Sequence, residues 1–210
     1  MDAEFWHEKW RKGDIGFHEA EGSLYLKKYF GLLGLERDAR VFLPLCGKTR
    51  DVGWLMEQGY RVVGAELSEV AVRELFEGLA LTEGYEVSSL GAMKQYSGEK
   101  VEVFVGNVFD LTKDMLGEVD AVFDRAALVA LPAEARLSYA AFLGNMVDGC
   151  PRLLVTLEYD QDSMQGPPHS VDGDEVRRLF GERYDLEKLD SREELIKGRI
   201  EGLETAWILR

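Results

Sequence analysis

Short apolar runs alternate along the chain with segments in which apolar residues recur every three or four positions. Five of these runs predict strands, at 41–45, 60–65, 101–105, 119–123 and 153–157. They are mostly apolar at consecutive positions, which is typical of strands in a parallel sheet that is covered on both faces. Two further runs, near 183–189 and 203–209, have no long crossover between them and can pair as an antiparallel hairpin.

Helical spacing predicts the segments between these strands. Helices are expected over 2–12, from Ser23 to Gly34, from Thr49 to about 58, from Ser68 through 79, and over 133–147 and 173–180. Ser23, Thr49 and Ser68 are predicted N-caps, because a hydroxyl there accepts a hydrogen bond from the first turn. Residues 82–99, rich in glycine, serine and charge, predict an irregular excursion. The alternation indicates an α/β fold with a doubly wound, mostly parallel, Rossmann-like sheet.

The first two predicted strands end in residues that suit a nucleoside site. The first runs into the turn 43–48, Leu-Pro-Leu-Cys-Gly-Lys, and the second finishes at Glu66. In doubly wound sheets such a turn brings backbone N–H groups close to a ligand, and the acid accepts hydrogen bonds from ribose hydroxyls. The same pattern also occurs as plain structure, since a carboxylate that ends an apolar strand needs a partner in any case. It indicates an adenosine-type cofactor without requiring one.

The turn lacks the glycines that phosphate-binding loops need. Gly47 is its one glycine, whereas dinucleotide sites use G-x-G-x-x-G and P-loops use G-x-x-x-x-G-K-[ST]. A ligand that has a ribose but no phosphate fits best, and S-adenosylmethionine is the obvious one. An NAD-binding Rossmann protein, or a module that binds the cofactor without catalysis, stays a rival interpretation.

Five segments together resemble the thiopurine S-methyltransferase family. They are the aromatic N-terminal residues 6–18, the turn 43–48, the second strand and its tip at 62–68, the segment 123–130 and the late loop 159–168. The match spans most of the chain, and Pro-Leu-Cys-Gly-Lys and Asp-Arg-x-Ala-Leu-Val are its most specific parts. The stretch 84–100 and the tail beyond about residue 185 carry no recognisable motif. The resemblance implies a seven-stranded methyltransferase sheet and S-adenosylmethionine as cofactor.

The resemblance also assigns roles to particular residues. It implies cofactor-binding positions at Trp10, Leu45, Glu66, Val108 and Arg125, and acceptor-binding positions at Phe17 and Arg125. Asn107, which follows the third strand, can place its amide at the adenine edge. Arg125 is the candidate catalytic residue, because its charge persists at all relevant pH values and can steady an anionic acceptor. The plainer alternatives are an apolar helix face for Trp10, core for Phe17, and the cofactor carboxylate as the ligand of Arg125.

The reaction implied is direct SN2 transfer of a sulfonium methyl group to a soft nucleophile. An ionised thiol or thione attacks without a dedicated general base, and the sequence has no Ser-His-Asp or Cys-His pattern. Holding the reactants in line contributes on the order of 7–11 kcal/mol. Residues 1–22 and the loop 159–168 are expected to form a lid. The expected acceptors are thiopurines or other aromatic and heterocyclic thiols, with selenium or tellurium species, halide and thiocyanate as open alternatives.

Composition narrows the class of protein. The 210 residues suffice for one α/β domain, 1–210, and no apolar run approaches the ~20 residues that cross a bilayer. A net charge of −14 argues against nucleic-acid binding through phosphate neutralisation. Cys46 and Cys150 form no disulfide framework, and the acidic N-terminus has no apolar signal core, so the cytoplasm is favoured. A monomer is expected, and no metal, because the histidines lie far from any Cys/His cluster.

Overall fold

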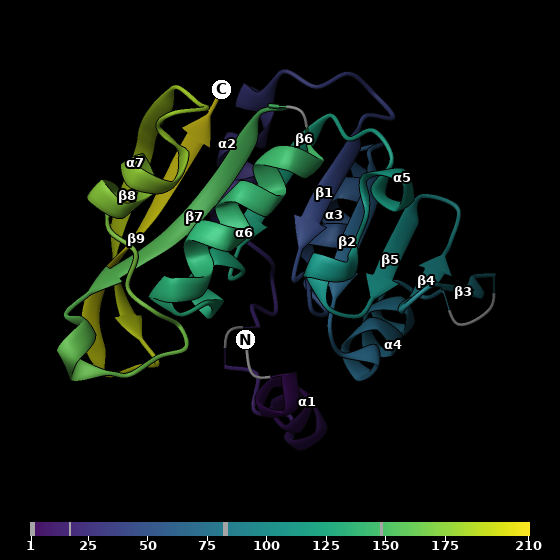
Figure 1. Ribbon diagram of the computed structural model, residues 1–210, viewed down its shortest axis with the longest axis horizontal. Coiled ribbons are helices and arrows are strands. Elements are labelled where there is room, and N and C mark those ends of the chain that lie inside the picture. Colours follow the sequence, from purple (N-terminus) through teal and green to yellow (C-terminus); the bar gives the residue numbers. More distant parts are fainter. Residues whose placement is uncertain (1–2, 17, 82–83, 148) are drawn as a thin grey trace.

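The computed structural model describes residues 3–16, 18–81, 84–147 and 149–210. In these ranges one sheet has nine strands in the order β3-β4-β5-β2-β1-β6-β7-β9-β8 (Figure 1). The strands are β1 (Arg40–Pro44), β2 (Arg61–Glu66), β3 (Glu86–Leu90), β4 (Met93–Ser97), β5 (Val101–Val105), β6 (Ala121–Arg125), β7 (Arg152–Tyr159), β8 (Leu186–Ile196) and β9 (Ile200–Leu209). The central strands β5, β2, β1, β6 and β7 run parallel, and the outer strands pair antiparallel.

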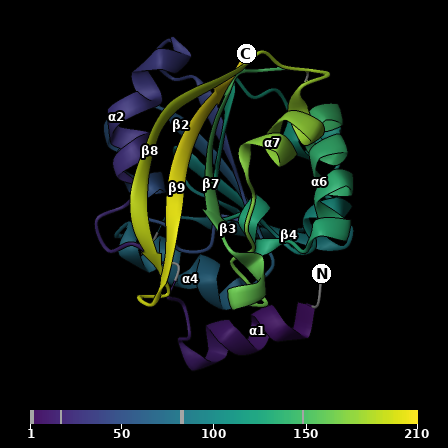
Figure 2. The ribbon, with the colours of Figure 1, turned by 90° about the vertical axis from the view of Figure 1, so that its left-hand side faces the viewer.

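Helices cover both faces of this sheet (Figures 1 and 2). They are α1 (Ala3–Lys12), α2 (Leu24–Tyr29), α3 (Asp51–Glu57), α4 (Glu69–Gly78), α5 (Lys113–Leu116), α6 (Ala133–Met146) and α7 (Gly173–Phe180), with short 3-10 turns η1 (Phe30–Leu33), η2 (Val108–Asp110), η3 (Leu128–Ala130) and η4 (Gln161–Ser163). Side chains of α2, α3 and α4 pack in one buried cluster, and those of α5, α6 and α7 pack in another. The fold is therefore a three-layer α/β sandwich, with α1 lying beyond the carboxyl ends of the central strands (Figure 1).

Each central strand supplies both cores, because successive side chains point to opposite faces. In β1, Val41 and Leu43 belong to the cluster under α2–α4, whereas Phe42 belongs to the cluster under α5–α7. All three are buried. Burying such a side chain contributes about 1.5–3 kcal/mol, so the consecutive apolar residues of the sequence are explained by burial on both sides.

Most of the predicted elements are confirmed. The five strands and the antiparallel C-terminal hairpin are present, and β8 and β9 are longer than predicted. Ser23 and Ser68 are N-caps that accept hydrogen bonds from the amides of Leu26 (3.3 Å) and Ala71 (3.4 Å). Gly34 ends η1 in the left-handed conformation, at φ 65°. The fold class is therefore as the sequence indicated.

Two predictions were wrong, and one predicted strand is shifted along the sequence. The stretch 82–99 contains the hairpin β3–β4, so the sheet has nine strands in the described ranges instead of seven. Every residue of β3 is exposed or half-buried, so the apolar pattern that would have predicted this strand is missing. The fourth strand begins at Ala121, later than predicted, and Arg125 is its last residue. Thr49 is not an N-cap: α3 starts after Arg50, and the Thr49 hydroxyl donates to the Asp51 carboxylate (2.7 Å).

No helix in the described ranges combines the length and the apolar character that crossing a membrane requires.

Candidate functional site

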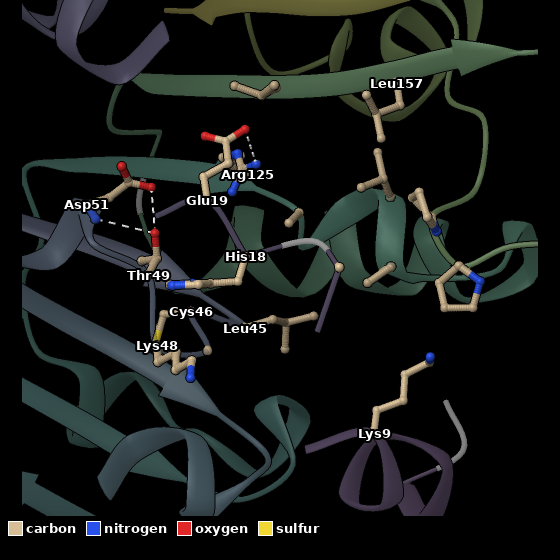
Figure 3. Close-up of a pocket in the computed structure, with 18 of the residues that line it drawn as sticks. Lys9, His18, Glu19, Leu45, Cys46, Lys48, Thr49, Asp51, Arg125 and Leu157 are labelled. Atoms are coloured by element: carbon tan, nitrogen blue, oxygen red, sulfur yellow. Dashed lines mark hydrogen bonds and ion pairs between the residues drawn. The ribbon is translucent and has the colours of Figure 1, made fainter. Parts of the chain in front are cut away.

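A cavity of about 700 Å³ opens at the carboxyl ends of β1, β2, β6 and β7 (Figure 3). Its walls come from the N-terminal segment, the turn after β1, the tips of β2 and β6, and the β8–β9 turn. The lining residues include Trp10, His18, Glu19, Leu45, Gly47, Asp51, Glu66, Arg125 and Glu204. This is the edge at which doubly wound sheets bind their ligands.

The turn after β1 is tight, and its backbone conformation leaves little room above it. Leu45 and Gly47 have φ values of 48° and 55°, in the left-handed region. A Cβ atom on Gly47 would lie 3.0 Å from Cζ2 of Trp10, so the indole ring rests directly against the glycine. Leu45 is only half-buried and lines the cavity. The turn therefore presents an apolar surface, and Trp10 can approach it closely because Gly47 has no side chain.

Glu66 at the tip of β2 is anchored by backbone N–H groups. One carboxylate oxygen accepts a hydrogen bond from the Gly47 amide (2.8 Å), and the other accepts one from the Ser68 amide (2.8 Å). The side chain lines the cavity and is 6% exposed. Burial raises the pKa of Glu66, and the backbone hydrogen bonds oppose that shift. Since an ionised carboxylate offers about four lone-pair sites, two stay available to a bound diol, so the site fits a ribose.

Arg125 forms an ion pair inside the same cavity. Its Nη2 atom lies 2.5 Å from Oε1 of Glu19, and the two side chains are 14% and 33% exposed (Figure 3). Burial raises the pKa of Glu19, the Arg125 charge opposes this, and the acids Glu204 and Asp51 add to it. Glu19 was not predicted as a site residue. The available signal was a charged residue directly after the Phe-His pair that ends the aromatic N-terminal segment.

Two buried aspartates hold the elements that carry this ion pair. Asp51, which is almost fully buried, accepts hydrogen bonds from the Ser23 amide (2.7 Å) and the Thr49 hydroxyl (2.7 Å), and so ties the segment after Glu19 to α3. Asp124, directly before Arg125, accepts from the Tyr139 hydroxyl (2.9 Å) and the Leu128 amide (3.1 Å). Burial raises the pKa of Asp124. These contacts fix the backbone on both sides of the ion pair.

His18 faces the same cavity in a cationic environment. Burial lowers the pKa of His18, and Lys48, Arg50 and Arg125 lower it further. Its side chain extends toward Thr49 and not toward Arg125 (Figure 3). His18 is therefore a neutral wall residue near pH 7.

The structure brings together four of the predicted site residues, Trp10, Leu45, Glu66 and Arg125. Asn107 and Val108 do not line this cavity: the Asn107 side chain accepts a hydrogen bond from the Phe109 amide (3.2 Å), and Val108 is buried in the core. Phe17 lies outside the described residues. Of the late loop, Pro167 and Pro168 line the cavity.

Comparisons of the sequence with known proteins identify its family. The model of the family described as thiopurine S-methyltransferase (TPMT) matches residues 1–206. A thiopurine S-methyltransferase of Xanthobacter autotrophicus is 46% identical over 212 residues, covering 100% of this chain and 99% of the relative. One of Teredinibacter turnerae is 46% identical over 211 residues, covering 100% of this chain and 97% of the relative.

Solved structures resemble the fold. The magnesium protoporphyrin IX methyltransferase of Synechocystis with bound SAH superposes with a TM-score of 0.67 at 12% identity, covering all of both chains. A SAM-dependent methyltransferase of Anabaena variabilis gives a TM-score of 0.68 at 13% identity, covering 99% of this chain and 94% of that one. These likenesses establish the methyltransferase fold, and the sequence matches establish the family. The chain belongs to the thiopurine S-methyltransferase family of S-adenosylmethionine-dependent methyltransferases.

Proposed function

We propose that this chain transfers the methyl group of S-adenosylmethionine to the sulfur of thiopurines or other aromatic and heterocyclic thiols. The observation that carries the proposal is one cavity in which a backbone-anchored acid, Glu66, and a cation, Arg125, lie at the tips of β2 and β6, on either side of β1. When bound, S-adenosylmethionine supplies an electrophilic methyl group on a sulfonium sulfur. The residues of the chain have to bind, align and desolvate the two reactants.

At the proposed cofactor end, formed by Trp10, Leu45, Gly47 and Glu66, the acid accepts hydrogen bonds from the ribose hydroxyls. Trp10 and Leu45 supply apolar surface around the turn. Asn107 and Val108 follow the neighbouring strand β5, whose last residue pairs with Glu66, and we assign the adenine to that side. An acid already fixed by two backbone N–H groups needs little reorganisation to bind a diol, which favours affinity.

At the proposed acceptor end, formed by Arg125 and the side chains around it, the guanidinium binds an anionic or hydrogen-bonding acceptor. Phe17 is assigned to the acceptor on the family resemblance alone. A soft anionic sulfur then attacks the methyl carbon in line, so that orientation is the main contribution of the protein. Arg125 acts by its positive charge and by the fixed directions of its N–H donors.

We further propose that residues 1–22 close the site as a lid, because Trp10 of α1 rests against Gly47 of the turn. Deleting residues 1–16 leaves the sheet and both cores in place and is expected to lower turnover on the order of 10²-fold, the effect of a misaligned site. Circular dichroism checks the fold, and labelled-methyl transfer measures the loss. Glu8→Ala, on the exposed side of α1, is the matched control. Normal turnover after the deletion would show a peripheral helix.

Transfer of labelled methyl from S-adenosylmethionine to an acceptor panel tests the function. The panel contains 6-mercaptopurine, simple aryl thiols, selenite, tellurite and iodide. We expect turnover of the thiopurine and the thiols to exceed that of the other acceptors, whereas a preference for selenite, tellurite or iodide would overturn the assignment. We also propose that the protein is a cytoplasmic monomer that acts on small molecules. Sedimentation of the purified chain tests the oligomeric state.

A further inference from the structure

The ion pair between Glu19 and Arg125 places a hydrogen-bond acceptor beside a donor at the proposed acceptor end. Nη2 of Arg125 and Oε1 of Glu19 are 2.5 Å apart, and both side chains line the cavity. A heterocyclic thione that carries a ring N–H next to its C=S group presents the complementary pair, one donor and one acceptor on the same edge. The N–H can donate to Glu19 while the sulfur or a neighbouring ring nitrogen accepts from Arg125.

The charges that face Glu19 favour a carboxylate that can take up a proton. Asp51 and Glu204 line the same cavity, and Glu204 also pairs with Arg192 at 2.6 Å. Burial and these two acids raise the pKa of Glu19, against the opposing charges of Arg125 and Arg192. A carboxylate shifted toward neutrality is the better proton acceptor near pH 7.

Methylation of a thione requires such an acceptor. A sulfur lone pair forms the new S–CH3 bond, and the donor C–S bond breaks with its electron pair left on the donor sulfur. The C=S bond becomes a single bond, the neighbouring C–N bond becomes C=N, and the ring nitrogen loses its proton. The products are the S-methyl heterocycle, S-adenosylhomocysteine and one proton, which has to leave the nitrogen.

We propose that Glu19 is the general base that accepts this ring N–H proton, and that it thereby selects heterocyclic thiones over acceptors that carry no such proton. The proposal rests on the proposed function. Arg125 keeps the carboxylate in place before the reaction and retains its own hydrogen bond to the acceptor afterwards. The protonated Glu19 then returns its proton to solvent through its exposed side. His18 is the competing base in the cavity, and its side chain points away from Arg125 (Figure 3).

Glu19→Gln tests the proposal when it is assayed on two acceptors, 6-mercaptopurine as a thione with a ring N–H and 4-nitrothiophenol as a thiolate without one. We expect kcat on 6-mercaptopurine to fall on the order of 10²-fold, the usual contribution of a general base. The kcat on 4-nitrothiophenol and the Kd of S-adenosylhomocysteine stay within about twofold of wild type, because positioning and cofactor binding are unchanged. Glu21→Gln, on an exposed residue of the same segment, is the matched control.

A pH series gives a second readout. As the pH rises and the thione ionises in solution, the N–H proton is already lost, so the deficit of Glu19→Gln on 6-mercaptopurine narrows. An equal loss on both acceptors would reduce Glu19 to a positioning residue for Arg125, and no loss would remove it altogether. A selective loss in His18→Gln instead would move the base to His18. If wild-type enzyme methylates neither acceptor, the proposed function itself fails, which is a different result from each of these.

Discussion

At the proposed cofactor end of the cavity the charged group is fixed by the backbone, whereas at the proposed acceptor end it is held by another side chain. Glu66 accepts hydrogen bonds from two amides of the chain and is almost fully buried. Glu19 is paired with the guanidinium of Arg125 and is one-third exposed. Backbone amides in a tight turn have one position, and two long side chains have several.

This difference fits the two proposed ligands. The methyl donor is the same molecule in every turnover, so a pre-formed site gains affinity and does not need to accommodate different ligands. Acceptors vary in size and charge, and an ion pair can rearrange around them at small cost because it is partly solvated. Substitutions at the two ends should therefore separate cofactor affinity from turnover.

The largest effect is expected from Arg125→Ala. It removes the acceptor's charged contact and leaves Glu19 half-buried without that partner, so kcat should fall on the order of 10²–10³-fold, as when one electrostatic donor is lost from an active site. The Kd of S-adenosylmethionine should stay within about twofold. Arg125→Lys keeps the positive charge and loses the paired N–H donors of the guanidinium, so its kcat should lie between those of wild type and Arg125→Ala. Steady-state kinetics and calorimetry measure both quantities. A weakened cofactor with normal kcat would place the cofactor carboxylate on Arg125.

Glu66→Gln should give the opposite pattern. The amide turns one of its NH2 hydrogens toward a backbone N–H and loses the charge-assisted bonds, which are worth about 1.5–3 kcal/mol each. The Kd of S-adenosylmethionine should rise about 10–100-fold, since 1.4 kcal/mol corresponds to tenfold. The kcat at saturating cofactor should change little. Isothermal titration measures the affinity, Glu69→Gln is the control on the neighbouring helix, and an unchanged Kd would refute the ribose assignment.

Gly47→Ala should have a smaller effect at the same end. The left-handed φ of 55° costs a residue with a Cβ atom roughly 1–2 kcal/mol, and the new methyl group presses on Trp10. We expect a cofactor Kd raised about fivefold to tenfold. In a double-mutant cycle with Trp10→Ala the two losses should not add, because both act on one contact. Gly31→Ala, where no atom lies within 4 Å of the added carbon, is the control. Additive losses would show that Trp10 and Gly47 act separately.

Strands could be predicted from the sequence wherever burial on both faces of the sheet requires apolar residues at consecutive positions. The segments 41–45 and 101–105 are apolar at all positions except Glu102 because both faces of the sheet are covered, so they were recognisable as strands. The hairpin β3–β4 was missed because its strands lie at the sheet edge, where β3 buries no residue. Thr49 was misassigned because α3 begins at Asp51, two residues later, so the Thr49 hydroxyl accepts from the Asp51 amide (3.3 Å) and donates to the Asp51 carboxylate in place of capping the first turn.

For the site, local motifs predicted positions at the carboxyl edge of the sheet, and Leu45, Glu66 and Arg125 do line the cavity there, because Glu66 and Arg125 end strands and Leu45 directly follows one. Glu19 and Glu204 were missed because they reach the cavity only in the folded structure, where residues far apart in the sequence come close together. Glu204 lies in the C-terminal hairpin and reaches the cavity only through the pairing of β7 with β9. No spacing in the sequence indicates that contact.

The smallest expected effect is that of Glu69→Gln on the free energy of unfolding. Glu69 lies three residues after Glu66, at the surface of the protein. Its carboxylate meets Lys94 (2.7 Å), the Tyr96 hydroxyl (2.7 Å) and Arg73 (3.0 Å), and these contacts, the Lys94 hydrogen bond first, lower its pKa to about 2. A folded pKa below the ordinary 4.5 stabilises the protein above that value, and the gain is lost as the pH falls toward about 2.

Solvent screening limits the contribution of such a surface cluster to about 0.5–1 kcal/mol. Urea unfolding of wild type and Glu69→Gln should therefore differ by that amount near pH 7, and the difference should shrink as the pH is lowered toward about 3. Glu66→Gln should show the opposite slope, because burial raises the pKa of Glu66 and its protonation favours the folded state. If the difference in unfolding free energy from wild type changed with pH in the same way for both variants, burial would not shift the pKa values of Glu66 and Glu69 in opposite directions. The contrast between a buried, backbone-anchored acid and a solvent-screened one would then lose its physical basis.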